Sequence, residues 1–232
     1  MCTLIVVSVV NYLIYTARWD FALLHPAYVA SQPPTISRAI SDPIVGDPFA
    51  VWMLICAPIL WIGVLLMIMT MWRGLRQNHG SGDGLKMVKN LSILVIFLQA
   101  LASSGMIILS QYRFPDHDEM HMFGSYLFFF SQAFVVFSGE LLSRAYDRLP
   151  PNSRLMLPAF CKLRRIAILG PIILSAVYLG LFIGKDFVSG PIRYVVLQAY
   201  VSIELLLISS FLFYILGWTP DCVLAVRRYL RA

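Results

Sequence analysis

The chain has 232 residues, of which 59% are hydrophobic and 13% are charged, and it carries a formal net charge of +6. A soluble domain has about 45–50% apolar and about 25% charged residues, so the composition excludes an ordinary soluble protein and favours a membrane protein. The four cysteines are scattered without the spacing of metal ligands, which argues against a disulfide framework and a zinc site.

Six apolar runs predict an all-α fold, a polytopic bundle of six transmembrane helices that forms a single domain over residues 1–232. A spanning helix needs about 20 residues. The first run is short, and it spans the membrane only if Met1 lies near one surface while Arg18 and Trp19 mark the other. The predicted helices cover about residues 4–16, 49–72, 91–111, 122–143, 166–184 and 194–218.

The longest predicted outer loop lies between the first two runs, over residues 18–48. It contains five prolines, which favour an extended, turn-rich segment rather than a helix. Its centre, Pro34–Asp42, places hydroxyl side chains between flanking prolines. A small ordered cap over the outer face is the alternative prediction for this segment.

The positive charge is distributed in a way that predicts the orientation. Of the 18 Lys and Arg residues, 13 fall in residues 73–90, residues 144–165 and the C-terminal tail. By the positive-inside rule these segments and both termini are cytoplasmic. Topology therefore accounts for the charge, and nucleic-acid binding has little support. Contact with anionic headgroups is best suited to Lys162, Arg164 and Arg165.

Two features lie inside predicted spans. Glu204 is placed near the midplane of the last helix, where an ionised acid costs about 2.5–3.5 kcal/mol, so it must face the interior and pair or stay protonated. A functional role and a structural interhelical hydrogen bond are both open for it. In the fifth predicted helix, Ala176, Gly180 and Gly184 recur at a spacing of four, which predicts close packing on a neighbouring helix.

The densest group of titratable side chains precedes the fourth predicted helix and comprises Asp116, His117, Asp118, Glu119 and His121. The two histidines share a face if the helix starts early, and with Asp116 or Asp118 they could bind a metal. The pattern is not the zincin His-Glu-x-x-His, because Asp118 stands where the catalytic glutamate belongs. An interfacial cluster that forms hydrogen bonds or contacts headgroups is favoured over a metal, and no other cofactor is expected.

Three segments together resemble the Frag/DRAM/Sfk family of six-helix membrane proteins, which includes the FGF-receptor-activating or post-GPI-attachment type. Pro34–Ser41, followed by Val51-Trp52, resembles the first outer loop of that family. His121–Ser125 is similar to its His-x-x-Gly-Ala motif, and Glu204 resembles the glutamate of its last helix. The chain departs from the pattern in carrying His117 just upstream of His121.

The resemblance implies a lipid-linked role: GPI-anchor lipid remodelling, phosphoinositide-kinase scaffolding and lipid asymmetry at the plasma membrane, or autophagy at lysosomes. The favoured hypothesis is an integral multi-pass protein of the plasma membrane or an endomembrane. It would be an accessory lipid-handling protein rather than an enzyme, with membrane lipids and other membrane proteins as partners. The predicted outer-leaflet site consists of Arg38, Ser37, Asp42, His121 and Glu204.

Two alternatives are kept. The first is a membrane-embedded lipid hydrolase or acyltransferase that uses His117 or His121 as a general base or as metal ligands with Asp116 or Asp118. The lack of a Gly-x-Ser-x-Gly motif disfavours it. The second is a transporter or a subunit of a larger complex, and no inverted repeat in the sequence supports transport.

Overall fold

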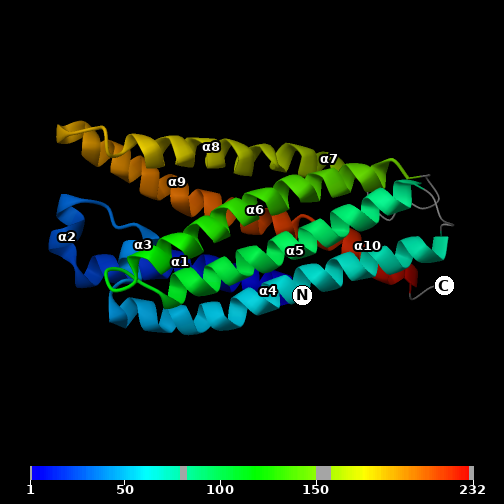
Figure 1. The fold of residues 1–232 in the computed structure, drawn as a ribbon, viewed down its shortest axis with the longest axis horizontal. Helices are drawn as coiled ribbons and strands as arrows, with labels where there is room; N and C mark the ends of the chain where they lie inside the picture. The colour runs from blue at the N-terminus through cyan, green and yellow to red at the C-terminus, as the bar shows by residue number, and fades with distance from the viewer. Residues whose placement is uncertain (1, 79–82, 150–157, 230–232) are drawn as a thin grey trace.

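A computed structural model describes residues 2–78, 83–149 and 158–229, and within these ranges all regular structure is helical. The long helices run side by side in an elongated bundle (Figure 1). The elements are α1 (Cys2–Leu24), α2 (Pro26–Ser31), α3 (Ile36–Ala39), α4 (Pro43–Asn78), α5 (Asp83–Gln111), α6 (Asp118–Asp147), α7 (Pro158–Ala167), α8 (Leu169–Gly184), α9 (Gly190–Leu216) and α10 (Thr219–Tyr229).

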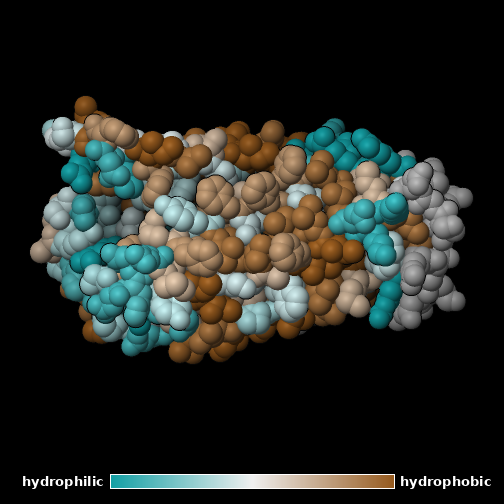
Figure 2. All heavy atoms as spheres, in the orientation of Figure 1, coloured by the Kyte–Doolittle hydropathy of each residue, from teal (hydrophilic) through white to brown (hydrophobic). Residues whose placement is uncertain are grey.

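The two ends of the bundle differ in character. One end carries α2, α3 and the connections after α5 and α8, and we call it the capped end (residues 25–42, 112–117 and 185–189) (Figure 1). We call the opposite end the basic end, and its described basic residues include Arg73, Arg144, Arg148, Arg165 and Arg227. Arg154 and Arg231, which contributed to the predicted orientation, lie outside the described residues. Hydrophobic atoms cover the middle of the visible face, and hydrophilic atoms gather toward its ends (Figure 2).

Five segments are long and apolar enough to cross a membrane. They are Pro43–Arg73, Gly84–Gln111, Asp118–Asp147, Lys162–Gly184 and Gly190–Leu224. Five of the six predicted helices begin earlier than expected, because the helical backbone extends beyond the start of the apolar run. The fourth, for example, starts at Asp118 rather than near Met122.

Helix α1 is longer than the predicted run 4–16 but is not among these five segments. It continues past Arg18 and Trp19 to Leu24. From Val7 onward its buried side chains recur every three or four residues, as a helix of 3.6 residues per turn requires, and α1 packs on α4 and α9. The buried apolar side chains of α1 are Val6, Val7, Val10, Ile14, Ala17 and Phe21.

The segment between α1 and α4 is the predicted ordered cap, and the prediction of an extended, non-helical loop is wrong. Two of the prolines in residues 18–48 stand at helix starts, where the missing N–H costs nothing: α2 begins with Pro26 and α4 with Pro43. Thr35 precedes α3, and its hydroxyl accepts a hydrogen bond from the backbone nitrogen of Arg38 at 3.1 Å. Local capping therefore folds this polar segment into short helices.

Helices α5 and α6 approach most closely at two glycines. A Cβ atom on Gly105 would lie 2.5 Å from the backbone nitrogen of Phe128, and one on Gly124 would lie 2.6 Å from the backbone nitrogen of Leu109. Only glycine fits at such a crossing. The predicted packing stripe on α8 is wrong, since an added Cβ on Gly180 or Gly184 meets no atom within 4 Å in the described part of the chain.

Candidate functional site

A cavity of about 480 Å³ lies between α6, α8 and α9, directly beneath the cap helix α3. We call it the cap cavity. Its volume is within the range of about 300–1,000 Å³ that ligand sites occupy. Its lining is mostly apolar and aromatic, with a few polar groups: Thr35, Ser37, Ser125, Ser175, Lys185 and Glu204.

Aromatic rings form one wall of the cap cavity. Phe129 of α6 stacks on Tyr178 of α8 with ring centroids 5.2 Å apart, and Tyr178 stacks on Tyr200 of α9 at 5.0 Å. The two tyrosine hydroxyls share a hydrogen bond of 2.9 Å. Phe130 and Leu179 also line the cavity and are 55% and 49% exposed, so it opens sideways between α6 and α8.

Glu204 sits where α9 meets the cap, and it is only 4% exposed. Its Oε2 atom accepts a hydrogen bond from the backbone nitrogen of Ile36 at 3.3 Å, which satisfies an otherwise orphaned N–H at the start of α3. The positive charge of Arg18 on α1 attracts this carboxylate. Glu204 therefore holds the cap from below and also lines the cap cavity.

His121 is fully buried at the start of α6 and joins three segments. Its Nδ1 lies 2.9 Å from the carbonyl oxygen of Tyr112, and its Nε2 lies 2.9 Å from the hydroxyl of Ser37 on α3. A carbonyl only accepts hydrogen bonds, so Nδ1 carries the hydrogen, and in the neutral ring Nε2 accepts from Ser37. This side chain positions the cap, and Ser37 in turn lines the cavity.

Two other predicted site residues stabilise the cap without lining the cavity. The guanidinium carbon of Arg38 lies 5.1 Å from the ring centroid of Tyr28, a cation–π contact at the protein surface. The carboxylate of Asp42 bonds to His25 Nε2 at 2.7 Å and accepts from the backbone nitrogen of Ile44 at 2.8 Å. The hydrogen bond from His25 is the main cause that lowers the pKa of Asp42 below its ordinary value.

The predicted metal ligands Asp116, His117, Asp118 and His121 do not converge. His121 points inward with both ring nitrogens engaged, whereas the other three are exposed. The ring of His117 instead packs edge-on against Tyr112, with centroids 5.4 Å apart. Among the described residues, no group of three or more His, Cys, Asp or Glu side chains could hold a metal ion.

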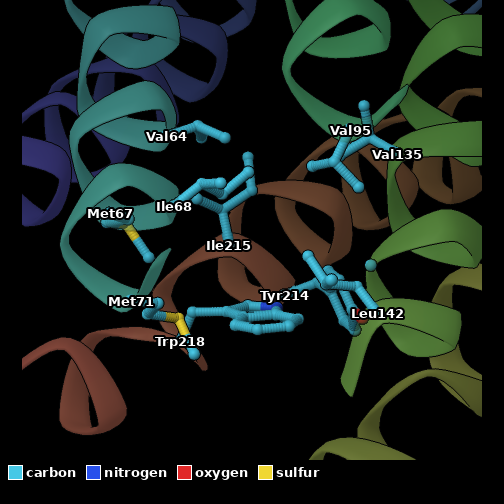
Figure 3. A pocket seen from close by; sticks show the side chains of 11 residues that line it. Val64, Met67, Ile68, Met71, Val95, Val135, Leu142, Tyr214, Ile215 and Trp218 are labelled. Carbon is cyan, nitrogen blue, oxygen red and sulfur yellow. The ribbon is translucent and has the colours of Figure 1, made fainter. Parts of the chain in front are cut away.

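A second cavity lies in the core, toward the basic end of the bundle, and Figure 3 shows the side chains around it. It measures about 30 Å³, too little for a lipid, and its lining is almost wholly apolar. Side chains of α4 and α9, among them Met67, Met71 and Ile215, surround it together with Trp218 (Figure 3). This cavity is a packing defect of the core, so the cap cavity is the better candidate site.

Of the residues predicted from the sequence, Ser37 and Glu204 line the cap cavity, and His121 contacts Ser37 from outside it. The sequence prediction did not include the aromatic wall. Tyrosines in apolar spans are a usable signal, because a tyrosine hydroxyl buried away from water usually finds a partner. Tyr178 and Tyr200 are such residues, but only the antiparallel packing of α8 on α9 makes them partners.

Five helical segments that are long and apolar enough to cross a membrane, with hydrophobic atoms over much of the middle of the visible face (Figure 2), define an integral multi-pass membrane protein. The sequence profile of the Frag1/DRAM/Sfk1/Cwh43P N-terminal domain matches residues 2–222, and the chain belongs to this family. The family resemblance noted in the sequence is thereby confirmed. No curated protein and no solved structure matched the chain.

Proposed function

We propose that this protein binds membrane lipid in the cap cavity and has an accessory, non-enzymatic lipid-handling role. The observation that supports this proposal most directly is the buried carboxylate of Glu204 in an aromatic cavity that opens sideways between α6 and α8. Apolar walls suit acyl chains, and a few convergent polar groups suit the polar part of one lipid. The role would be of the kind the family resemblance implies: GPI-anchor lipid remodelling, lipid asymmetry or membrane scaffolding.

The polar groups of the cavity are arranged for an amphiphile. Lys185 lies at the outer end of α8 and suits a phosphate at the mouth. Glu204, with the hydroxyls of Ser37 and Ser125, suits hydroxyl or ester groups deeper under the cap. His121 acts through Ser37, so we assign it a positioning role.

The proposal includes six spans with both termini on the cytoplasmic side. Helix α1 has 23 residues, more than the roughly 20 that a span needs. The concentration of arginines at the basic end supports a cytoplasmic location for that end. The cap cavity would then serve the outer or lumenal leaflet.

The test is photolabelling of the protein in nanodiscs by a phospholipid with a diazirine near the middle of one acyl chain. Peptides from α6, α8 and α9 are expected to carry most of the label. Ala176→Trp fills the cavity from α8 and should remove that label. Ile173→Trp adds the same ring to an exposed position of α8 outside the cavity lining and should leave it unchanged.

Glu204→Gln keeps the size of the side chain and removes its charge. If the carboxylate meets the lipid's polar part, this variant lowers labelling of the cavity while α3 stays in place, as amide exchange of residues 36–40 would report. Label spread evenly around the bundle, or equal labelling in all of these variants, would reject the cap cavity as a lipid site.

A further inference from the structure

A third cavity, which is lined by charged side chains and measures about 390 Å³, lies at the basic end. Its lining residues are Arg144, Asp147, Arg148 and Arg165. We call it the arginine cavity. Three of these residues come from the end of α6 or directly follow it, and Arg165 comes from α7. It lies at the other end of the bundle from the cap cavity and does not depend on the function proposed above.

The charges of the arginine cavity are only partly neutralised. The Nε atom of Arg144 donates to Glu140 at 2.9 Å. Arg165 pairs with Asp147 and lies 3.9 Å from Glu140. Arg148 is exposed and forms no ion pair within the described residues. Three guanidinium groups against two carboxylates leave one positive charge, which matches an anion of a single charge.

The position of the arginine cavity along the bundle favours a lipid ligand over a free ion. One candidate span ends at Asp147 and the next begins at Lys162, so the guanidinium groups lie at the level of the headgroups. On α7, Leu163 and Ile166 are 58% and 61% exposed beside Arg165. Apolar side chains exposed next to arginines are typical of a helix in the membrane interface.

A buried anchor fixes α7 in this position. Arg164 is 2% exposed, pairs with Asp221 and donates to the carbonyl oxygen of Gly217 at 3.0 Å. Its guanidinium carbon lies 4.7 Å from the ring centroid of Trp218. The prediction that Arg164 contacts headgroups is therefore wrong, because its charge is used inside the protein. The same anchor sets the position of Arg165 at the surface.

We propose that the arginine cavity binds the phosphodiester of an anionic glycerophospholipid from the leaflet at the basic end. Guanidinium groups suit phosphate oxygens through paired N–H donors. A zwitterionic lipid is disfavoured, since its headgroup cation would meet the arginines. The single positive charge that the two carboxylates leave unneutralised favours a singly charged phosphodiester over a polyphosphate headgroup.

The test is native mass spectrometry of the delipidated full chain, titrated with phosphatidylglycerol or phosphatidylcholine. Wild type should bind phosphatidylglycerol more tightly. Arg148→Gln should weaken that binding about fivefold, the effect of one basic side chain near a membrane surface. Lys86→Gln removes the same charge from an exposed position on α5 at the same end and should have no such effect. Asp147→Asn frees Arg165 and should strengthen binding, a gain that misfolding does not produce.

Three outcomes would overturn the proposal. They are equal losses in Arg148→Gln and Lys86→Gln, weaker binding in Asp147→Asn, and equal affinity for the two lipids. Competition by soluble sn-glycerol 3-phosphate at concentrations near those of the lipid would also overturn it, because it would assign the site to free phosphates.

Discussion

Ser37→Ala is the sharpest probe of how the cap is held. The substitution removes the hydroxyl that bonds to Nε2 of His121 at 2.9 Å and changes little else. The net contribution of one such hydrogen bond is about 0.5–1.5 kcal/mol. Opening of the cap should therefore become about 2- to 13-fold more frequent. The bond joins residues 84 positions apart, so the effect belongs to tertiary structure.

Hydrogen exchange of the protein in nanodiscs measures this opening directly. The amides of residues 36–42 should exchange faster in Ser37→Ala by that factor, while those of α9 near the basic end stay unchanged. Ser31→Ala is the matched control, because the hydroxyl of Ser31 is exposed and bonds only to the nearby carbonyl of Tyr28. Its effect on residues 36–42 should be negligible.

A double-mutant cycle with His121→Ala decides whether the two side chains act through each other. Groups in direct contact couple by about 0.5–3 kcal/mol, so the double variant should open less often than the sum of the single effects predicts. Additive effects, or equal exchange in Ser37→Ala and Ser31→Ala, would refute the reasoning that His121 holds the cap through Ser37.

Three further predictions concern packing, a buried ion pair and pH. Gly124→Ala places a methyl group 2.6 Å from a backbone nitrogen of α5 and should cost about 1–3 kcal/mol of unfolding free energy, whereas Gly180→Ala faces open space and should be neutral or slightly stabilising. Asp221→Ala leaves a buried arginine without its carboxylate and should cost about 3–5 kcal/mol. In His25→Gln the pKa of Asp42 should rise toward its ordinary value of about 3.9, as carboxyl-carbon NMR of labelled aspartate would detect.

The sign of the pH effect follows from the lowered pKa of Asp42 in the folded protein. The pair with His25 stabilises the cap fully above the unfolded value, and that stabilisation is lost as the pH falls through the folded one. A titration midpoint of Asp42 that is unchanged in His25→Gln would contradict this effect of His25 on the pKa of Asp42.

Equal thermal stability of the two glycine variants would contradict the close approach of α5 and α6. A loss below 1 kcal/mol in Asp221→Ala would contradict a fully desolvated pair.

The cap shows where sequence patterns stop being informative. The prolines in residues 18–48 predicted an extended loop. Proline also favours the first turn of a helix, so the same residues are compatible with short helices. Local capping by Thr35 and the tertiary hydrogen bonds of Glu204 and His121 stabilise the helical conformation. Neither anchor is visible in a local window, because each partner is more than 80 positions away.

The sequence by itself determined the class of the molecule. Apolar runs of about 20 residues are imposed by the thickness of the bilayer, and backbone groups in lipid must be satisfied within each helix, so composition and run length alone predict a helical membrane protein. It also marked Glu204 and His121 as unusual, since buried polar groups in apolar surroundings are costly.

Only the tertiary structure decided which of these groups meet. Pairing across the bundle depends on helix rotation and on close approaches such as that at Gly124, which a single chain does not encode in a local pattern. In the tertiary structure His121, a predicted metal ligand, supports the cap instead. Arg164 is buried there, whereas Arg165 lies at the surface. Neighbouring residues of the same type thus received opposite roles, because adjacent positions on a helix point about 100° apart.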